Sequence, residues 1–94
     1  MHVKWLRKAL TNLEAESSFI AHENPQAASN LVKTVESSVS LLAQNPSLGR
    51  PGRVPGTREL VIEGFPYLIP YRLRGKVVQI LRVFHTSRQL PQKW

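Results

Sequence analysis

The chain has 94 residues, with 13 Lys and Arg against six Glu and no Asp, and its formal net charge of +7 favours an acidic protein, nucleic acid or an anionic surface as partner. The length predicts one domain over residues 1–94 with a modest core, and the absence of cysteine excludes disulfides, thiolate zinc sites and cysteine nucleophiles. Because no apolar run approaches the roughly 20 residues that span a bilayer and the first residues show no long apolar h-region, we expect an unprocessed cytoplasmic protein without a membrane partner.

The N-terminal residues predict a short strand followed by a helix. His2-Val3-Lys4-Trp5 alternates polar and apolar side chains, which is typical of a strand at or beside the edge of a sheet. From Leu6 onward the apolar residues recur at steps of three and four, which indicates one stripe of an amphipathic helix. Its members are Leu6, Ala9, Leu10, Leu13, Ser17 and Ile20, and His22-Glu23-Asn24-Pro25 ends it.

The next element has the clearest helical pattern of the chain. Asn24 is suited to cap the helix N-terminus, and Pro25 to be its first residue. The apolar period continues to about Gln44, where Asn45-Pro46 stops it. We therefore expect residues 6–44 to form a helical hairpin that packs on one face of a sheet. The second stripe comprises Ala28, Leu31, Val32, Val35, Val39 and Leu42.

Residues 45–56 are rich in Pro and Gly, which predicts a loop with a restricted backbone. This loop would present Arg50 and Arg53 to solvent. Two basic side chains therefore precede the sheet.

Three runs of β-branched and aromatic residues follow, at Leu60–Ile62, Tyr67–Leu73 and Val77–Phe84. Residues 63–66 and 74–76 break them, and connections this short join antiparallel neighbours. The sequence thus predicts an α+β fold. A short N-terminal strand and a helical hairpin pack on a mostly antiparallel sheet that ends in a three-strand meander.

The two faces of the middle strand differ in character. By the two-residue period, the odd-numbered residues from Tyr67 to Leu73 form a buried face, while Arg72 and Arg74 share the other face with Leu68 and Pro70. Proline cannot donate a ladder hydrogen bond, so Pro70 predicts an edge or a bulge.

The order of these elements and their motifs resembles the ParE/RelE superfamily of bacterial type II toxins over nearly the whole chain. The resemblance implies a small cytoplasmic toxin that a cognate antitoxin silences by folding over its surface in a hetero-oligomer. The matching residues are Trp5, Asn24-Pro25-Ala27-Ala28, Asn45-Pro46-Leu48-Gly49-Arg50, Gly56-Thr57-Arg58-Glu59-Leu60, Pro66-Tyr67, Tyr71-Arg72 and Ile80-Leu81-Arg82-Val83 with His85.

The run from Gly49 to Leu60 and the Ile80–Val83 segment are more similar to the ParE branch, which the resemblance associates with binding and poisoning of DNA gyrase. On this interpretation no residue is catalytic and no cofactor or metal is used. The arginines are then the contacts to antitoxin and target: Arg50, Arg53, Arg58, Arg72, Arg74, Arg82 and Arg88.

The alternative is the RelE branch, which the resemblance associates with cleavage of messenger RNA on the ribosome. Cleavage through the 2′-hydroxyl requires a base, an acid and cations that stabilise the charged phosphorane. Glu59 or His85 would be base or acid, and His85 would lie on the opposite face from Arg82 unless a bulge intervenes. The candidate cations are Arg58, Arg72, Arg82 and Arg88.

Each candidate also has a structural interpretation. His85 would be a structural histidine at a strand end, Glu59 would pair with Arg58, and Tyr67 and Tyr71 would be core aromatics. A third hypothesis is a non-toxic basic binding module, which harmless expression in a bacterial host would support.

Overall fold

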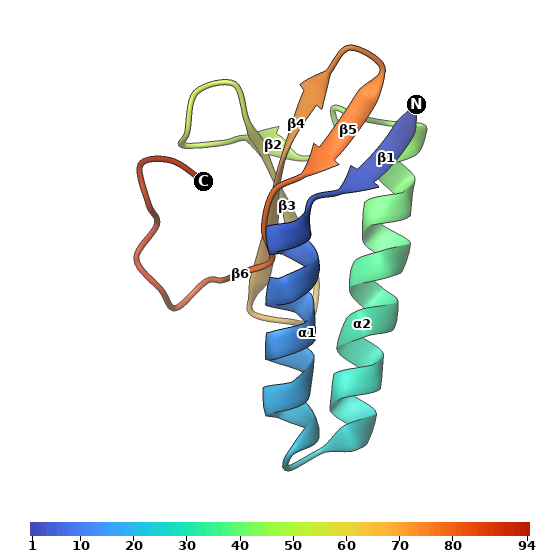
Figure 1. Ribbon diagram of the computed structural model, residues 1–94, viewed down its shortest axis with the longest axis vertical. Coiled ribbons are helices and arrows are strands. Elements are labelled where there is room, and N and C mark those ends of the chain that lie inside the picture. The colour runs from blue at the N-terminus through green and yellow to red at the C-terminus, as the bar shows by residue number, and fades with distance from the viewer.

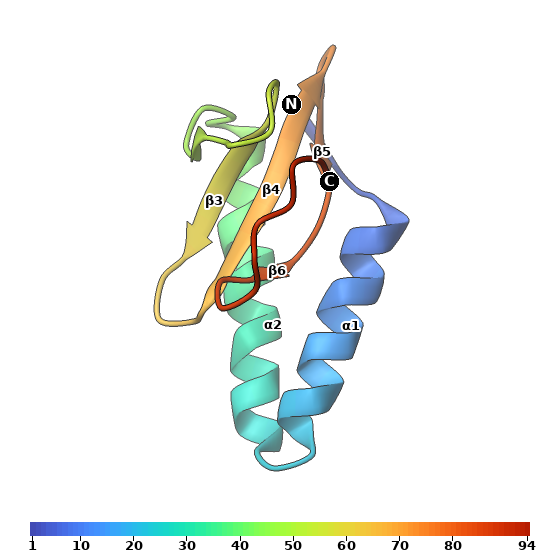
Figure 2. The same ribbon diagram turned by 90° about the vertical axis from the view of Figure 1, so that its left-hand side faces the viewer.

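The computed structural model describes residues 1–94 and consists of a helical hairpin on one face of a sheet. Figure 1 shows the two helices side by side, and Figure 2 shows the sheet in front of the second helix, with the first helix to one side and the C-terminal segment crossing the other face of the sheet. The elements are β1 (His2–Trp5), α1 (Arg7–Ala21), α2 (Pro25–Ser40), the 3₁₀ turn η1 (Leu41–Ala43), β2 (Arg50–Pro51), β3 (Arg58–Ile62), β4 (Tyr67–Arg74), β5 (Val77–Ile80) and β6 (Phe84–His85).

The strand order is β1-β5-β4-β3-β2, with β6 also paired to β4. The expected meander is confirmed, because β3, β4 and β5 are antiparallel neighbours. Gly64 and Gly75 have φ angles of 84° and 58° in the two turns, a region that glycine enters without steric penalty. β1 lies at the edge and pairs with β5 in parallel. The expected loop contains a two-residue strand, β2, which pairs with the start of β3.

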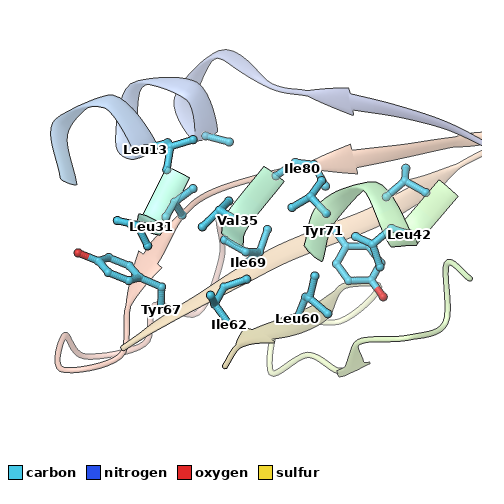
Figure 3. Packing of buried hydrophobic residues seen from close by; sticks show 14 residues of the cluster. Leu13, Leu31, Val35, Leu42, Leu60, Ile62, Tyr67, Ile69, Tyr71 and Ile80 are labelled. Atoms are coloured by element: carbon cyan, nitrogen blue, oxygen red, sulfur yellow. The ribbon is translucent and has the colours of Figure 1, made fainter. Parts of the chain in front are cut away.

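The hydrophobic core lies between the helices and the sheet. In Figure 3, Leu31 and Val35 of α2 lie over Ile62 of β3 and Ile69 of β4, and all four are at most 1% exposed. Full burial of each such aliphatic side chain contributes about 1.5–3 kcal/mol.

Tyr67, Ile69 and Tyr71 of β4 point into this core, as the alternation predicts. Leu73 was expected on the same buried face, but it is 43% exposed because it lies at the end of the strand, beyond the helices, so that part of the prediction was wrong.

The first helix buries less of its apolar stripe than its spacing predicts. Ala9 and Leu13 are buried, but Leu10 is 51% exposed, so its assignment to the core was wrong. The reason is tertiary: α1 packs mainly on α2 and lies beside the sheet, so only a narrow face reaches the core.

The second helix begins as predicted. The side chain of Asn24 accepts a hydrogen bond from the backbone N–H of Ala27 at 3.0 Å, and Pro25 occupies the first helical position. The α-helix ends at Ser40 and tightens into η1, so helical structure stops at Ala43, one residue before the predicted end.

The third strand of the meander is interrupted opposite Pro70. Ile80 pairs with Tyr71 and Phe84 with Leu68, so four steps along one strand match three along the other. This extra residue is a bulge, and the N–H of Leu81 donates to the carbonyl of Pro70 at 2.9 Å. The expected continuous strand over residues 77–84 is therefore two strands. β4 itself is central, so the bulge and not an edge accommodates the proline.

Candidate functional site

The sheet face opposite the helices contains a groove of about 690 Å³. The loop at residues 54–57, the first turn of α1 and the end of the C-terminal segment form its walls. None of the 14 residues that line it is acidic. Six of them are cations, and we call these the groove cations: Arg7, Lys8, Arg72, Arg74, Arg82 and Lys93.

β4 positions two groove cations. Arg72 and Arg74 are even-numbered in a strand whose first three odd-numbered residues lie in the core, so both point to the open face. Arg72 lies opposite Gln79 of β5, and its Nε donates to the Gln79 Oε1 at 2.8 Å. This bond fixes one edge of the guanidinium and leaves its terminal nitrogens free for a ligand.

The bulge positions a third groove cation. Leu81 and Arg82 follow one another in the chain and both line the groove, whereas Val83 returns to the core. A regular strand would alternate Leu81 and Arg82 between the two faces. The bulge thus turns Arg82 toward Arg72 and also restores the register in which His85 pairs with Tyr67.

The end of the chain folds back onto this arginine. Arg82 donates from Nη2 to the main-chain oxygen of Trp94, and the Trp94 ring meets Phe84 edge-on at a centroid distance of 5.2 Å. The indole N–H of Trp94 is buried without a hydrogen-bond partner. Such an unpaired buried donor is unfavourable and rare in native structures.

Sequence reasoning missed Arg7, Lys8 and Lys93. The N–H of Leu6 donates to the carbonyl of Ile80 at 3.0 Å, which places the start of α1 beside the groove. This helix has no side-chain cap and no acidic residue in its first turn. Cations at a helix N-terminus interact unfavourably with the helix dipole. The unfavourable position of Arg7 and Lys8 is the feature of the sequence that could have indicated a functional role for them.

Three other predicted arginines lie outside the groove lining. Arg50 pairs with Glu59 at 3.3 Å, and the backbone N–H of Arg53 donates to the other oxygen of Glu59 at 3.2 Å. Arg58 donates to the carbonyl of Gly49 at 2.7 Å. The expected pairing of Glu59 with Arg58 was therefore wrong, because Arg58 points to the helix side while Glu59 lies 2% exposed on the other.

His85 and Arg88 lie in a different hollow, of about 550 Å³, between α1 and the start of β4. Arg88 pairs with Glu16 at 3.1 Å, and the Tyr67 hydroxyl donates to the other Glu16 oxygen at 2.7 Å. Burial, with a smaller contribution from Glu16, raises the pKa of Tyr67 above its usual range. His85 meets the Tyr67 ring edge-on at 5.0 Å.

The residues that could act as acid or base are thus separated from the groove cations. His85 faces the helix side of the sheet, and Arg82 faces the open side. Glu59 is occupied by Arg50 and the backbone of Arg53. The arrangement presents positive charge for binding but does not assemble an acid, a base and a phosphate clamp at one point.

No group of three or more His and Glu side chains lies close enough to hold a metal ion. Neither helix is long and apolar enough to cross a bilayer.

Comparisons with known proteins agree in family and fold. The sequence model described as "ParE toxin of type II toxin-antitoxin system, parDE" matches residues 3–90. The inferred toxin Y4kP of Sinorhizobium fredii is 41% identical over 90 residues, which cover 96% of this chain and 93% of that one. Toxin RelE2 of Caulobacter vibrioides is 33% identical over 86 residues, which cover 92% of this chain and 96% of that one. A solved chain described as "Chromosomal ParDE TA system from P. aeruginosa" superposes with a TM-score of 0.82 at 36% identity. The superposition covers 90% of this chain and 95% of that one.

Proposed function

Because the chain belongs to the ParE toxin family of type II toxin–antitoxin systems, we propose that it arrests bacterial growth by binding DNA gyrase and poisoning it. Such a system has two proteins, so membership of the family implies a cognate antitoxin as partner. The toxin would act in the cytoplasm, where gyrase and the antitoxin meet it.

The observation that carries this proposal is the separation of charge from acid–base chemistry. The groove gathers six cationic side chains and no acidic side chain, while Glu59 and His85 lie elsewhere, in contacts of their own. A toxin that acts by binding needs a complementary charged surface and no catalytic residue. Guanidinium groups suit that role because they bond carboxylates and phosphates in a planar, two-point fashion.

The groove cations are the proposed target contacts, with Arg72, Arg74 and Arg82 at their centre. Arg50, Arg53, Arg58 and Arg88 lie outside the groove lining and are proposed as further contacts to the antitoxin. An antitoxin with an acidic, flexible segment would neutralise the toxin by occupying this basic face.

The test is titration of the purified protein against gyrase and relaxed plasmid. We expect loss of supercoiling and, after denaturation of the enzyme, accumulation of cleaved plasmid. The groove variant Arg72→Gln/Arg74→Gln should inhibit more weakly. Lys33→Gln is its control, because Lys33 is an exposed cation of α2 outside the groove lining. Normal supercoiling at a large molar excess of folded protein would contradict the proposal.

A second candidate function is ribosome-dependent cleavage of messenger RNA. It is favoured by the name of the Caulobacter vibrioides relative, toxin RelE2. It predicts codon-phased cuts on programmed ribosomes that disappear in His85→Ala or Arg72→Ala while antitoxin binding persists. The location of His85 in a different hollow from the groove cations counts against this function.

A further inference from the structure

The charged side chains that line the groove are all hydrogen-bond donors. Their terminal nitrogens come from four different parts of the fold: the start of α1, the end of β4, the bulge and the C-terminal segment. Beyond the bonds of Arg72 to Gln79 and of Arg82 to Trp94, no side-chain hydrogen bond or ion pair occupies the groove cations. A ligand that fits this lining offers acceptors and negative charge at several points.

We propose that this groove binds the phosphate backbone of DNA, and that a phosphate takes the place of the Trp94 main-chain oxygen on Arg82. The proposal rests on gyrase as the target, because gyrase holds duplex DNA that a toxin bound near it would contact. The toxin would then contact enzyme and DNA together.

The chemistry of the lining fits a nucleic acid more closely than an acidic peptide on its own, so the antitoxin would compete for these cations with the help of its contacts outside the groove. A peptide brings its own N–H donors and spaced carboxylates, which need acceptors as well as donors in the site. A nucleic acid strand presents a regular row of anionic oxygens that accept only, and arginine contacts them bidentately. Four of the groove cations are arginines.

The contacts of Trp94 indicate that this structure represents the groove without a ligand. Its indole N–H is buried without a partner, and its main-chain oxygen occupies one guanidinium of the groove. The segment from Thr86 onward forms no helix or strand. Displacement of Trp94 would free Arg82 and relieve the unpaired donor, so a phosphate can compete for this place.

The experiment measures the binding of a labelled 30-base-pair duplex to the purified protein by fluorescence anisotropy, between 50 and 200 mM salt. If four or five phosphates are contacted, the slope of log K against log salt is about −4. In Arg72→Gln/Arg74→Gln we expect about tenfold weaker binding and a slope reduced by about 2. Lys33→Gln/Lys76→Gln removes the same charge from exposed sites outside the groove lining and is expected to change affinity less than about threefold.

A second measurement follows Trp94 directly. The chain has two tryptophans, so in a Trp5→Phe variant the emission reports Trp94 alone. We expect the duplex to shift this emission toward that of solvent-exposed indole, with the same midpoint as the anisotropy. An unchanged emission with bound DNA would overturn the displacement of Trp94.

Binding of other ligands tests whether the ligand of the groove is DNA. Tighter binding of a single-stranded RNA of equal charge, or equal binding of a polyglutamate peptide, would overturn the assignment to DNA. Equal loss of affinity in the groove variant and its control would overturn the groove itself. DNA binding without gyrase inhibition would refute gyrase as the target and support the groove as a DNA-binding site. Full gyrase inhibition by Arg72→Gln/Arg74→Gln would support gyrase as the target and refute a role of the groove in inhibition.

Discussion

At the residue scale, Glu59 is the clearest case of a candidate catalyst with a structural role. Its carboxylate is 2% exposed, pairs with Arg50 and accepts from the backbone of Arg53. Replacement by Gln removes the charge from a buried contact, so we expect Glu59→Gln to lower the free energy of unfolding by about 1–3 kcal/mol in urea titrations.

The exposed Glu63 provides the matched control, and Glu63→Gln is expected to change stability by less than about 0.5 kcal/mol. At equal amounts of folded protein, Glu59→Gln should remain as toxic as the natural chain. Abolished toxicity in a fully folded Glu59→Gln protein would restore Glu59 as a catalyst.

Two buried tyrosines predict how stability depends on alkaline pH. Burial raises the pKa of both Tyr67 and Tyr71 above 10.0, their ordinary value, and Glu16 adds to the effect on Tyr67. Because the folded state holds these protons more tightly, their contribution is complete below the unfolded pKa of about 10 and is lost as pH rises beyond it. Urea titrations between pH 9 and 11 should show this fall, and Tyr67→Phe should make it shallower. An identical pH profile in the variant would contradict this explanation.

Single residues also show how much of the site could be predicted. The two-residue period placed Arg72 and Arg74 on one face, because alternation is local. Pro70 correctly indicated a bulge, yet no local rule fixed which residue would bulge, and this decides where Arg82 points. Arg7 and Lys93 reach the groove only through long-range packing.

At the element scale, the helical hairpin depends on a cap that was visible in the sequence. Asn24 satisfies one of the free N–H groups at the start of α2. We expect Asn24→Ala to lower the free energy of unfolding by about 0.5–2 kcal/mol, measured by urea denaturation.

The control is Asn30→Ala, an exposed substitution within the same helix. Alanine favours a helix interior, so the loss of the Asn30 contact with Gln26 should be largely offset and the change should stay within about 0.5 kcal/mol. Equal destabilisation by the two substitutions would show that the cap has no special role.

Elements differed in how well local pattern specified them. Helix periods, turn glycines and the antiparallel meander followed from neighbours in sequence. The parallel pairing of β1 with β5 and the two-residue β2 depend on contacts between distant segments, which a single sequence does not encode locally. The exposure of Leu10 has the same origin, since it follows from where α1 lies relative to the sheet.

At the scale of the whole molecule, charge is distributed unevenly. The groove contains no acidic residue although the chain has six Glu. We therefore expect the affinity for the cognate antitoxin to fall as salt rises from about 0.1 to 1 M, because the Debye length shrinks from about 10 to 3 Å. Calorimetric titration at several salt concentrations would measure this.

Arg74→Gln should weaken antitoxin binding and reduce its salt dependence, whereas Lys33→Gln should change both less. Arg74 is suited to this test because it is exposed and its side chain makes no internal hydrogen bond or ion pair. An affinity independent of salt would refute the electrostatic account of this surface.

One fold carries both chemistries that the sequence suggested, so the architecture alone does not select a target. The placement of side chains is what supports the proposed target over the alternative. Arg72 and Arg82 share the open face, while His85 lies on the helix side beside Tyr67. Binding without catalysis is the function that this placement supports.

The most direct test of that claim is gyrase supercoiling and ribosome-programmed messenger cleavage, measured on one preparation of the toxin and its variants. The account predicts loss of supercoiling with intact messenger, retained in His85→Ala and weakened in Arg72→Gln/Arg74→Gln. Codon-phased cleavage of the messenger with unaffected gyrase, abolished in His85→Ala, would contradict it.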